Sequence, residues 1–142
     1  MYYKCKYFKL YELLPKEIYI DEYFGWDFFD RRLLETIDVV REILNIPLVC
    51  NNWHAGGDRN LCGFRDKNCK IGAKNSAHKK GMAADLISPK ITASKMRELI
   101  KLNKDKLPYN VRIEKWDSNG KEITWLHIDV IDKGVKVYEF RA

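Results

Sequence analysis

Two of the three histidines in this 142-residue sequence have neighbours that can share a metal ion with them. Asp85 follows His78 by seven positions, and His127 lies between Trp125 and Asp129. A catalytic zinc site needs three protein ligands and one position left open for water, and two histidines with one aspartate meet that requirement. We therefore predict a zinc ion bound by His78, Asp85 and His127.

The spacing alone does not separate a metal site from ordinary packing. The gap between His78 and Asp85 is not the i, i+4 spacing that places two residues on one helix face, so a turn at Gly81 must bring them together. A histidine in a strand beside a tryptophan is often only a hydrogen-bonded, partly buried side chain, and a His-x6-Asp pair recurs by chance. The residues by themselves leave both interpretations open.

Taken together, the two segments resemble a known family. Ser76 to Asp85 reads SxHxxGxAxD and Trp125 to Asp129 reads WxHxD, a pair similar to that of the zinc D-alanyl-D-alanine carboxypeptidase superfamily. This superfamily includes phage L-alanyl-D-glutamate endopeptidases and the peptidase-like domain of hedgehog proteins. The resemblance extends from Phe8 to Val130, and the run from Asn51 to Ser76 is especially similar to the small phage and prophage members.

The resemblance implies a zinc metallopeptidase that hydrolyses peptidoglycan stem peptides or cross-links, as an endolysin or a carboxypeptidase does. His78, Asp85 and His127 would be its zinc ligands. Such an enzyme would be encoded by a phage or prophage and would act at the cell wall. The alternative is a catalytically inactive, zinc-binding module of the same fold that only binds the cell wall.

Four further residues are candidates for the site, and the resemblance implies the role of one of them. Family members use an arginine upstream of the first histidine to hold a substrate carboxylate or carbonyl, and here that residue is Arg65. A guanidinium group suits this role because it binds a carboxylate through two parallel hydrogen bonds. Ser76 is expected to support the ligands from behind, and His54 and Trp125 are expected to line the substrate cleft. An ordinary surface arginine is the alternative for Arg65.

The general base is where this sequence departs from the family pattern. Many members carry Glu or Asp three residues before the last zinc histidine, and Thr124 stands there in this chain. A threonine cannot take a proton from an attacking water, so another carboxylate must serve or the protein is inactive. We predict that Glu114 is this base. A solvated strand carboxylate that pairs with a neighbouring basic residue is the alternative.

The expected position of Glu114 depends on a hairpin. Asn119–Gly120 is a strong signal for a two-residue turn. The register of such a turn places Glu114 on the same face as His127, one residue pair away. Asp129 lies on that face too and is expected to orient His127 through its second ring nitrogen, whereas Glu122 is expected to be exposed near the turn.

Two helices are predicted from apolar periodicity. Between Phe28 and Leu44, apolar residues recur at intervals of three and four, which is typical of an amphipathic helix, and Pro47 follows where a helix cannot easily continue. A second helix is expected to begin with Thr92 or Ser94 as its cap and to run through Leu102.

Strands are predicted for the last third of the chain, where apolar and polar residues alternate. They form an antiparallel meander over residues 111–116, 123–130 and 135–140, and residues 48–50 are predicted to form a short buried strand. The long segment 51–80, rich in Gly, Asn, Cys and Lys, is expected to build the site. We therefore predict an α+β fold, with helices packed on a small antiparallel sheet in a single domain over residues 1–142.

The net charge of +6 favours an anionic partner, such as a cell-wall polymer. Nucleic acid is disfavoured as a partner because the lysines are dispersed along the chain and no binding motif for DNA or RNA is present. No stretch approaches the roughly 20 apolar residues that span a bilayer, and residues 1–10 lack the apolar core of a signal peptide. We expect a monomer made in the cytoplasm, without stable membrane insertion and with reduced cysteines.

Overall fold

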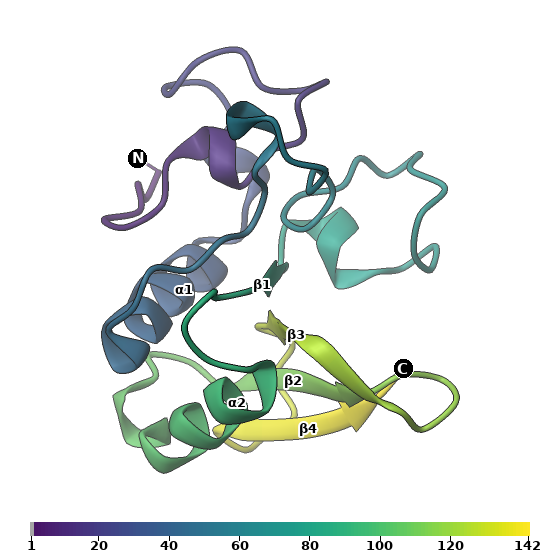
Figure 1. Ribbon diagram of the computed structural model, residues 1–142. Helices are drawn as coiled ribbons and strands as arrows, with labels where there is room; N and C mark the ends of the chain where they lie inside the picture. The colour runs from purple at the N-terminus through teal and green to yellow at the C-terminus, as the bar shows by residue number, and fades with distance from the viewer. Residues whose placement is uncertain (1) are drawn as a thin grey trace.

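Four strands and a helix in the second half of the chain, together with a helix in the first half, come together around one sheet (Figure 1). The computed structural model describes residues 2–142. Its helices and strands are α1 Arg31–Leu44, β1 Ala83–Leu86, α2 Ala93–Leu102, β2 Val111–Trp116, β3 Glu122–Asp129 and β4 Val137–Arg141. They form one compact α+β domain, as predicted. None of the helices in residues 2–142 is long and apolar enough to cross a membrane.

Both predicted helices are confirmed, and each begins at a side-chain cap. The Asp30 carboxylate accepts a hydrogen bond from the Arg32 amide at the start of α1 (2.9 Å). The Thr92 hydroxyl accepts one from the Lys95 amide at the start of α2 (3.1 Å). Such caps satisfy backbone donors that have no partner inside the helix. α1 begins later than predicted because Trp26–Phe28 forms a separate 3₁₀ turn.

The sheet is mixed, which corrects the predicted antiparallel meander. Its strand order is β1-β3-β2-β4, with β1 and β2 antiparallel to β3 and with β4 parallel to β2. β1 and β2 occupy both edges of β3, and the outer edge of β1 is bonded to Cys62 and, just beyond the strand, to Val49, so the last strand pairs with the free edge of β2. β3 ends where β2 begins, so residues 130–136 suffice to start β4 beside Val111. The strand predicted over residues 48–50 is only an isolated bridge between Val49 and Ile87.

The hairpin between β2 and β3 has a three-residue loop, so the predicted two-residue turn is wrong. The Asp117 amide donates to the Lys121 carbonyl (2.8 Å), and Gly120, at a φ of 80°, donates to the Asp117 carbonyl (2.9 Å). The Asp117 carboxylate stabilises this wider turn by accepting from the Lys121 amide (2.9 Å). A further irregularity between the two strands, in which residues 123–126 of β3 face only Lys115 of β2, shifts the register again. Glu114 therefore lies directly opposite His127 rather than one pair away.

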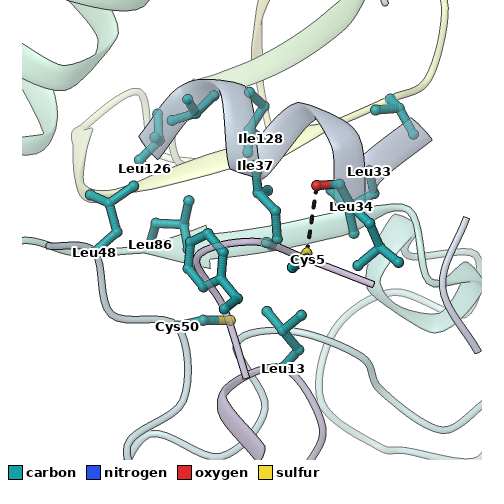
Figure 2. Close-up of a cluster of buried hydrophobic side chains, with 14 of the residues drawn as sticks. Cys5, Leu13, Leu33, Leu34, Ile37, Leu48, Cys50, Leu86, Leu126 and Ile128 are labelled. Atoms are coloured by element: carbon teal, nitrogen blue, oxygen red, sulfur yellow. Dashed lines mark hydrogen bonds between the residues drawn. The ribbon is translucent and has the colours of Figure 1, made fainter. Parts of the chain in front are cut away.

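The hydrophobic core fills the space between α1, the N-terminal segment and one face of the sheet (Figure 2). Its buried side chains include Cys5, Leu13, Leu33, Leu34, Ile37, Leu48, Cys50, Leu86, Leu126 and Ile128. All four cysteines are free thiols. Because successive side chains on a strand point to opposite faces, the neighbours of the buried strand residues lie on the far face of the sheet. Asp85, His127 and Glu114 are among them.

Candidate metal centre

One row of residues crosses all four strands on the sheet face that points away from the core. Asp85 on β1 pairs with His127 on β3, and His127 pairs in turn with Glu114 on β2. Glu114 then pairs with Phe140 on β4. Directly opposite residues have Cβ atoms about 5 Å apart. Strand pairing alone therefore brings one carboxylate to each side of His127.

His78 reaches this row from the short 3₁₀ turn η4, Ala77–Lys80. The chain reverses at Gly81, which ends η4 with a left-handed φ of 67°, and then enters β1. A Cβ at Gly81 would lie 2.2 Å from the Phe28 carbonyl oxygen, so a larger residue does not fit. The turn at Gly81 that the sequence requires is present, and it brings His78 and Asp85 together.

Three ligand atoms converge at this point. Asp85 Oδ1 lies 3.3 Å from His78 Nε2 and 2.9 Å from His127 Nδ1, and all three atoms lie within 4.8 Å of one another. Ligand atoms bound at about 2.1 Å to one tetrahedral ion lie roughly 3.4 Å apart. The observed spacing therefore suits a single ion, and these three largely buried side chains could hold a metal.

Each imidazole is oriented by an acceptor at its other ring nitrogen. His78 Nδ1 lies 2.8 Å from the Gly63 carbonyl oxygen, and His127 Nε2 lies 3.0 Å from Asp129 Oδ2. An N–H on each of these nitrogens leaves the lone pair of the other nitrogen facing Asp85, as metal binding requires. Asp129 thus occupies the place behind His127 that the sequence analysis expects.

Arg112 holds Asp129 in turn, and nothing in the sequence marks it for this role. Its Nε and Nη2 donate to the two carboxylate oxygens of Asp129 at 3.0 and 2.9 Å, and its guanidinium lies 4.1 Å from the centre of the Phe140 ring. Burial opposes ionisation of Asp129, yet hydrogen bonds from His127 and Arg112 keep its pKa below the ordinary value. Asp129 therefore stays an acceptor for His127.

The main chain of Asp85 is fixed by the long loop that precedes it. β1 lies at one edge of the sheet, and there the Asp85 amide donates to the Cys62 carbonyl (2.7 Å). The Asp85 carbonyl accepts from Arg59 Nη2 (3.0 Å), and Arg59 Nε donates to the Cys50 carbonyl (2.7 Å). The loop contributes to the site by holding a ligand in place. Arg59 also escapes sequence reasoning, because one arginine in a polar loop carries no distinguishing pattern.

The negative charge of Asp85 and the positive charge of His127 stabilise each other. Burial opposes the negative charge of Asp85, but hydrogen bonds from His127 and His78 hold its pKa well below the ordinary value. Burial also opposes the positive charge of His127, but hydrogen bonds to Asp129 and Asp85 raise its pKa to about 9. Asp85 is therefore an anion ready to bind a cation, and a metal would replace the proton that it shares with His127.

The ligands open onto a cavity of about 450 Å³. Its wall includes Arg65, Ser76, Glu114, Trp125 and Phe140. Glu114 is half-buried there. Burial raises its pKa, and the nearby His127 offsets only part of that effect. A carboxylate with this environment, beside three potential metal ligands and facing a cavity, is placed as a proton acceptor needs to be.

Arg65 and Ser76 belong to the long loop and line the same cavity as Glu114. Arg65 Nε donates to the Leu61 carbonyl (2.7 Å), and Nη2 lies 3.7 Å from Asp85 Oδ2. Gly72 leaves room for this side chain, since a Cβ there would lie 2.6 Å from Arg65 Nη1. Ser76 caps η4 by accepting from the His78 amide (3.3 Å). Both residues thus support a ligand, while Arg65 Nη1 has no partner among residues 2–142.

Two other residues lie elsewhere. His54 is exposed, with its ring centre 4.2 Å from that of Tyr11, and it does not line the cavity. Glu122 is half-exposed and pairs with Arg97 (2.8 Å). Side chains alternate between the two faces of β3, so Trp125, His127 and Asp129 lie on the face of the metal centre. Thr124 lines a different cavity, although it is only three residues from His127. A carboxylate in place of Thr124 would therefore face that other cavity and point away from the ligands.

Arg112→Gln is expected to lower metal affinity about 10- to 100-fold, because Asp129 loses the pair that fixes it behind His127. Arg112→Lys keeps the charge but not the two parallel hydrogen bonds, so it should recover only part of the loss. Competition with a chromophoric chelator measures the zinc affinity of both variants. Arg31→Gln is the control, because it removes a largely exposed arginine that contacts Glu35 and the Tyr3 ring and lies away from the metal centre. Unchanged affinity in Arg112→Gln would show that Asp129 needs no support.

Comparisons of the chain with protein families, with curated proteins and with solved structures give no match.

Proposed function

We propose that this protein is a zinc-dependent peptidase that hydrolyses peptidoglycan stem peptides or their cross-links. One observation carries the proposal: His78, Asp85 and His127 converge within 4.8 Å, and Glu114 lies directly opposite His127 on the wall of the same cavity. A metal site with three protein ligands, an open side and an adjacent carboxylate is the arrangement that metal-assisted hydrolysis uses.

Zinc is the metal that the donor set favours. Two imidazole nitrogens and one carboxylate oxygen are common zinc ligands, and three of them leave a fourth position open. Sites for magnesium or calcium are instead built almost entirely from oxygen ligands. The acceptors behind His78 and His127 also match the second layer of hydrogen bonds that zinc-binding imidazoles have.

Glu114 would act as general base and then as general acid. When bound, zinc supplies Lewis-acid chemistry at the scissile carbonyl and makes water more acidic. Glu114 takes a proton from the attacking water and returns it to the leaving amine. Its half-buried position supports this cycle, because a raised pKa brings the carboxylate closer to the pH at which it must accept and release a proton.

Arg65 would hold the substrate carbonyl or carboxylate. Its Nε and Nη2 already face Leu61 and Asp85, so Nη1 is the nitrogen left for substrate. The side chain is mostly buried and contacts both Leu61 and Asp85, so the direction of its Nη1 group is fixed. Trp125 and Phe140 add apolar wall to the same cavity. The choice of peptidoglycan peptides as the substrate rests on the SxHxxGxAxD and WxHxD motifs.

Metal analysis and hydrolysis together test the proposal. The purified protein is expected to contain one zinc per chain and to release fragments from peptidoglycan, and a chelator should stop this release until zinc is restored. Zinc binding without any hydrolysis of wall peptides would instead support the non-catalytic, wall-binding module. A protein that takes up no zinc would contradict both functions.

A further inference from the structure

The net charge of this protein is concentrated in one segment beside the metal centre. Residues 65–80 contain six basic residues and one acidic residue, which gives this segment a charge of +5 out of the net +6 of the chain. The other 20 lysines and arginines are nearly balanced by 19 acidic residues. Lysines are thus dispersed along the chain, but positive charge without a nearby balancing carboxylate is not. We call residues 65–80 the basic rim.

The lysines of the basic rim are available to a ligand. Lys67, Lys70, Lys74 and Lys80 are exposed and Lys79 is half-buried. None of the five has an ion-pair partner within residues 2–142, whereas Lys101, for example, pairs with Glu139. Unpaired lysines on one short segment create a local positive potential that attracts anions from a distance set by the ionic strength.

The basic rim also borders the candidate active site. Gly72, Ala73, Asn75 and Ser76 line the cavity, and the segment ends in the ligand-bearing turn η4. In Figure 1 this segment is part of the teal loop at the right of the view, above the side of the sheet where the chain ends. An anion bound along the rim would therefore lie next to the cavity mouth rather than at a remote surface.

The composition of the rim favours a polymer of repeated phosphates without bases. Lysine ammonium groups bind phosphates as point charges and read no sequence. Residues 65–80 contain no Phe, Tyr or Trp on which bases could stack. The only regular element in the segment is a four-residue 3₁₀ turn, so it offers no α-helix or two-stranded ribbon for a DNA groove. These features argue against a dedicated nucleic-acid surface.

We propose that the basic rim binds a polyol-phosphate polymer of the cell wall and so holds the active-site cavity against the wall. The choice of a wall polymer rests on the proposed peptidoglycan substrate, but the binding itself requires no hydrolysis. Contacts between lysines and phosphates release counterions, so the affinity should fall steeply as salt concentration rises. Removal of rim lysines should weaken binding and also reduce its dependence on salt.

Fluorescence anisotropy with labelled poly(glycerol phosphate) tests the proposal over a series of salt concentrations. The triple variant Lys67→Gln, Lys70→Gln and Lys74→Gln is expected to bind at least about tenfold more weakly than the parent and with a smaller salt slope. A control variant with Lys4→Gln, Lys104→Gln and Lys106→Gln removes the same charge from exposed sites elsewhere and should stay within about twofold of the parent.

Equal losses in the two variants would show that only net charge matters and would overturn the proposal, as would parent-like binding by the rim variant. Binding of single-stranded or duplex DNA through the same three lysines, as tight as binding of the polymer, would assign the rim to nucleic acid instead. Hydrolysis of a short soluble stem peptide, measured separately, should be equal in parent and rim variant. Failure of that hydrolysis in the parent would count against the proposed function and not against the rim.

Discussion

Glu114→Gln is expected to lower the rate of peptide hydrolysis by about 10²-fold or more while leaving one zinc per chain. The substitution keeps the size and polarity of the side chain but removes its capacity to accept a proton. Glu114 lies opposite His127 and is not one of the three converging ligands, so metal binding should survive. Steady-state kinetics on a soluble stem peptide, together with metal analysis of the same sample, measures both effects.

Glu122→Gln is the matched control for this prediction. Glu122 lies at the start of β3, is half-exposed and faces Arg97 rather than the cavity. Its replacement can weaken the pair with Arg97 but should leave the turnover of the folded enzyme near that of the parent. Parent-like hydrolysis by Glu114→Gln would exclude Glu114 as the base. Asp129 could not readily take over, because it is fully buried and already bonded to Arg112 and His127.

His127→Ala is expected to remove most of the bound metal and with it all measurable hydrolysis. Loss of a hydrogen-bond partner behind a ligand weakens metal binding by up to about 100-fold. Loss of one of the three ligands themselves should weaken it by more. A metal that binds only the folded state stabilises it by about 2.7 kcal/mol when its free concentration is 100 times the dissociation constant. The parent should therefore melt at a higher temperature with zinc than without, and His127→Ala should lose this increase.

His54→Ala provides the control for a histidine outside the centre. His54 is exposed against Tyr11 and does not line the cavity. Its replacement should leave zinc content, the zinc-dependent rise in melting temperature and hydrolysis unchanged. Full zinc occupancy in His127→Ala would remove His127 from the ligand set. Loss of zinc in His54→Ala would place the metal elsewhere.

Local patterns in the sequence are sufficient to predict the helices, whereas the three potential metal ligands were predicted only once two motifs were read together as a resemblance. The apolar period that marks residues 28–44 is a property of a single helix, and the Asp30 and Thr92 caps act within one turn. The ligands stand out because only a few residue types bind metals and because Gly81 permits the reversal between His78 and Asp85. The helices, their caps and the turn at Gly81 do not depend on distant parts of the chain, but the meeting of His127 with Asp85 does.

The tertiary structure alone decided the register of the strands. The loop of three residues after Asp117 and the extra residues of β3 opposite Lys115 depend on the balance of several weak hydrogen bonds, and a shift by one residue turns every side chain to the other face. This balance placed Glu114 opposite His127 and brought Arg112 to Asp129. It is also why the sequence predicted the face on which Glu114 lies but missed the arginine that holds Asp129.

The residues that could perform chemistry were thus determined by the sequence, while their support was determined by the fold. Residue type dictates what can bind a metal, and turn geometry dictates which neighbours in the chain can meet. The parallel pairing of β4, the contact of Arg59 with the Asp85 carbonyl and the displacement of His54 from the cavity each join segments far apart in sequence. Such contacts form only when competing strand edges and buried polar groups are all satisfied at once, and no local pattern encodes that outcome.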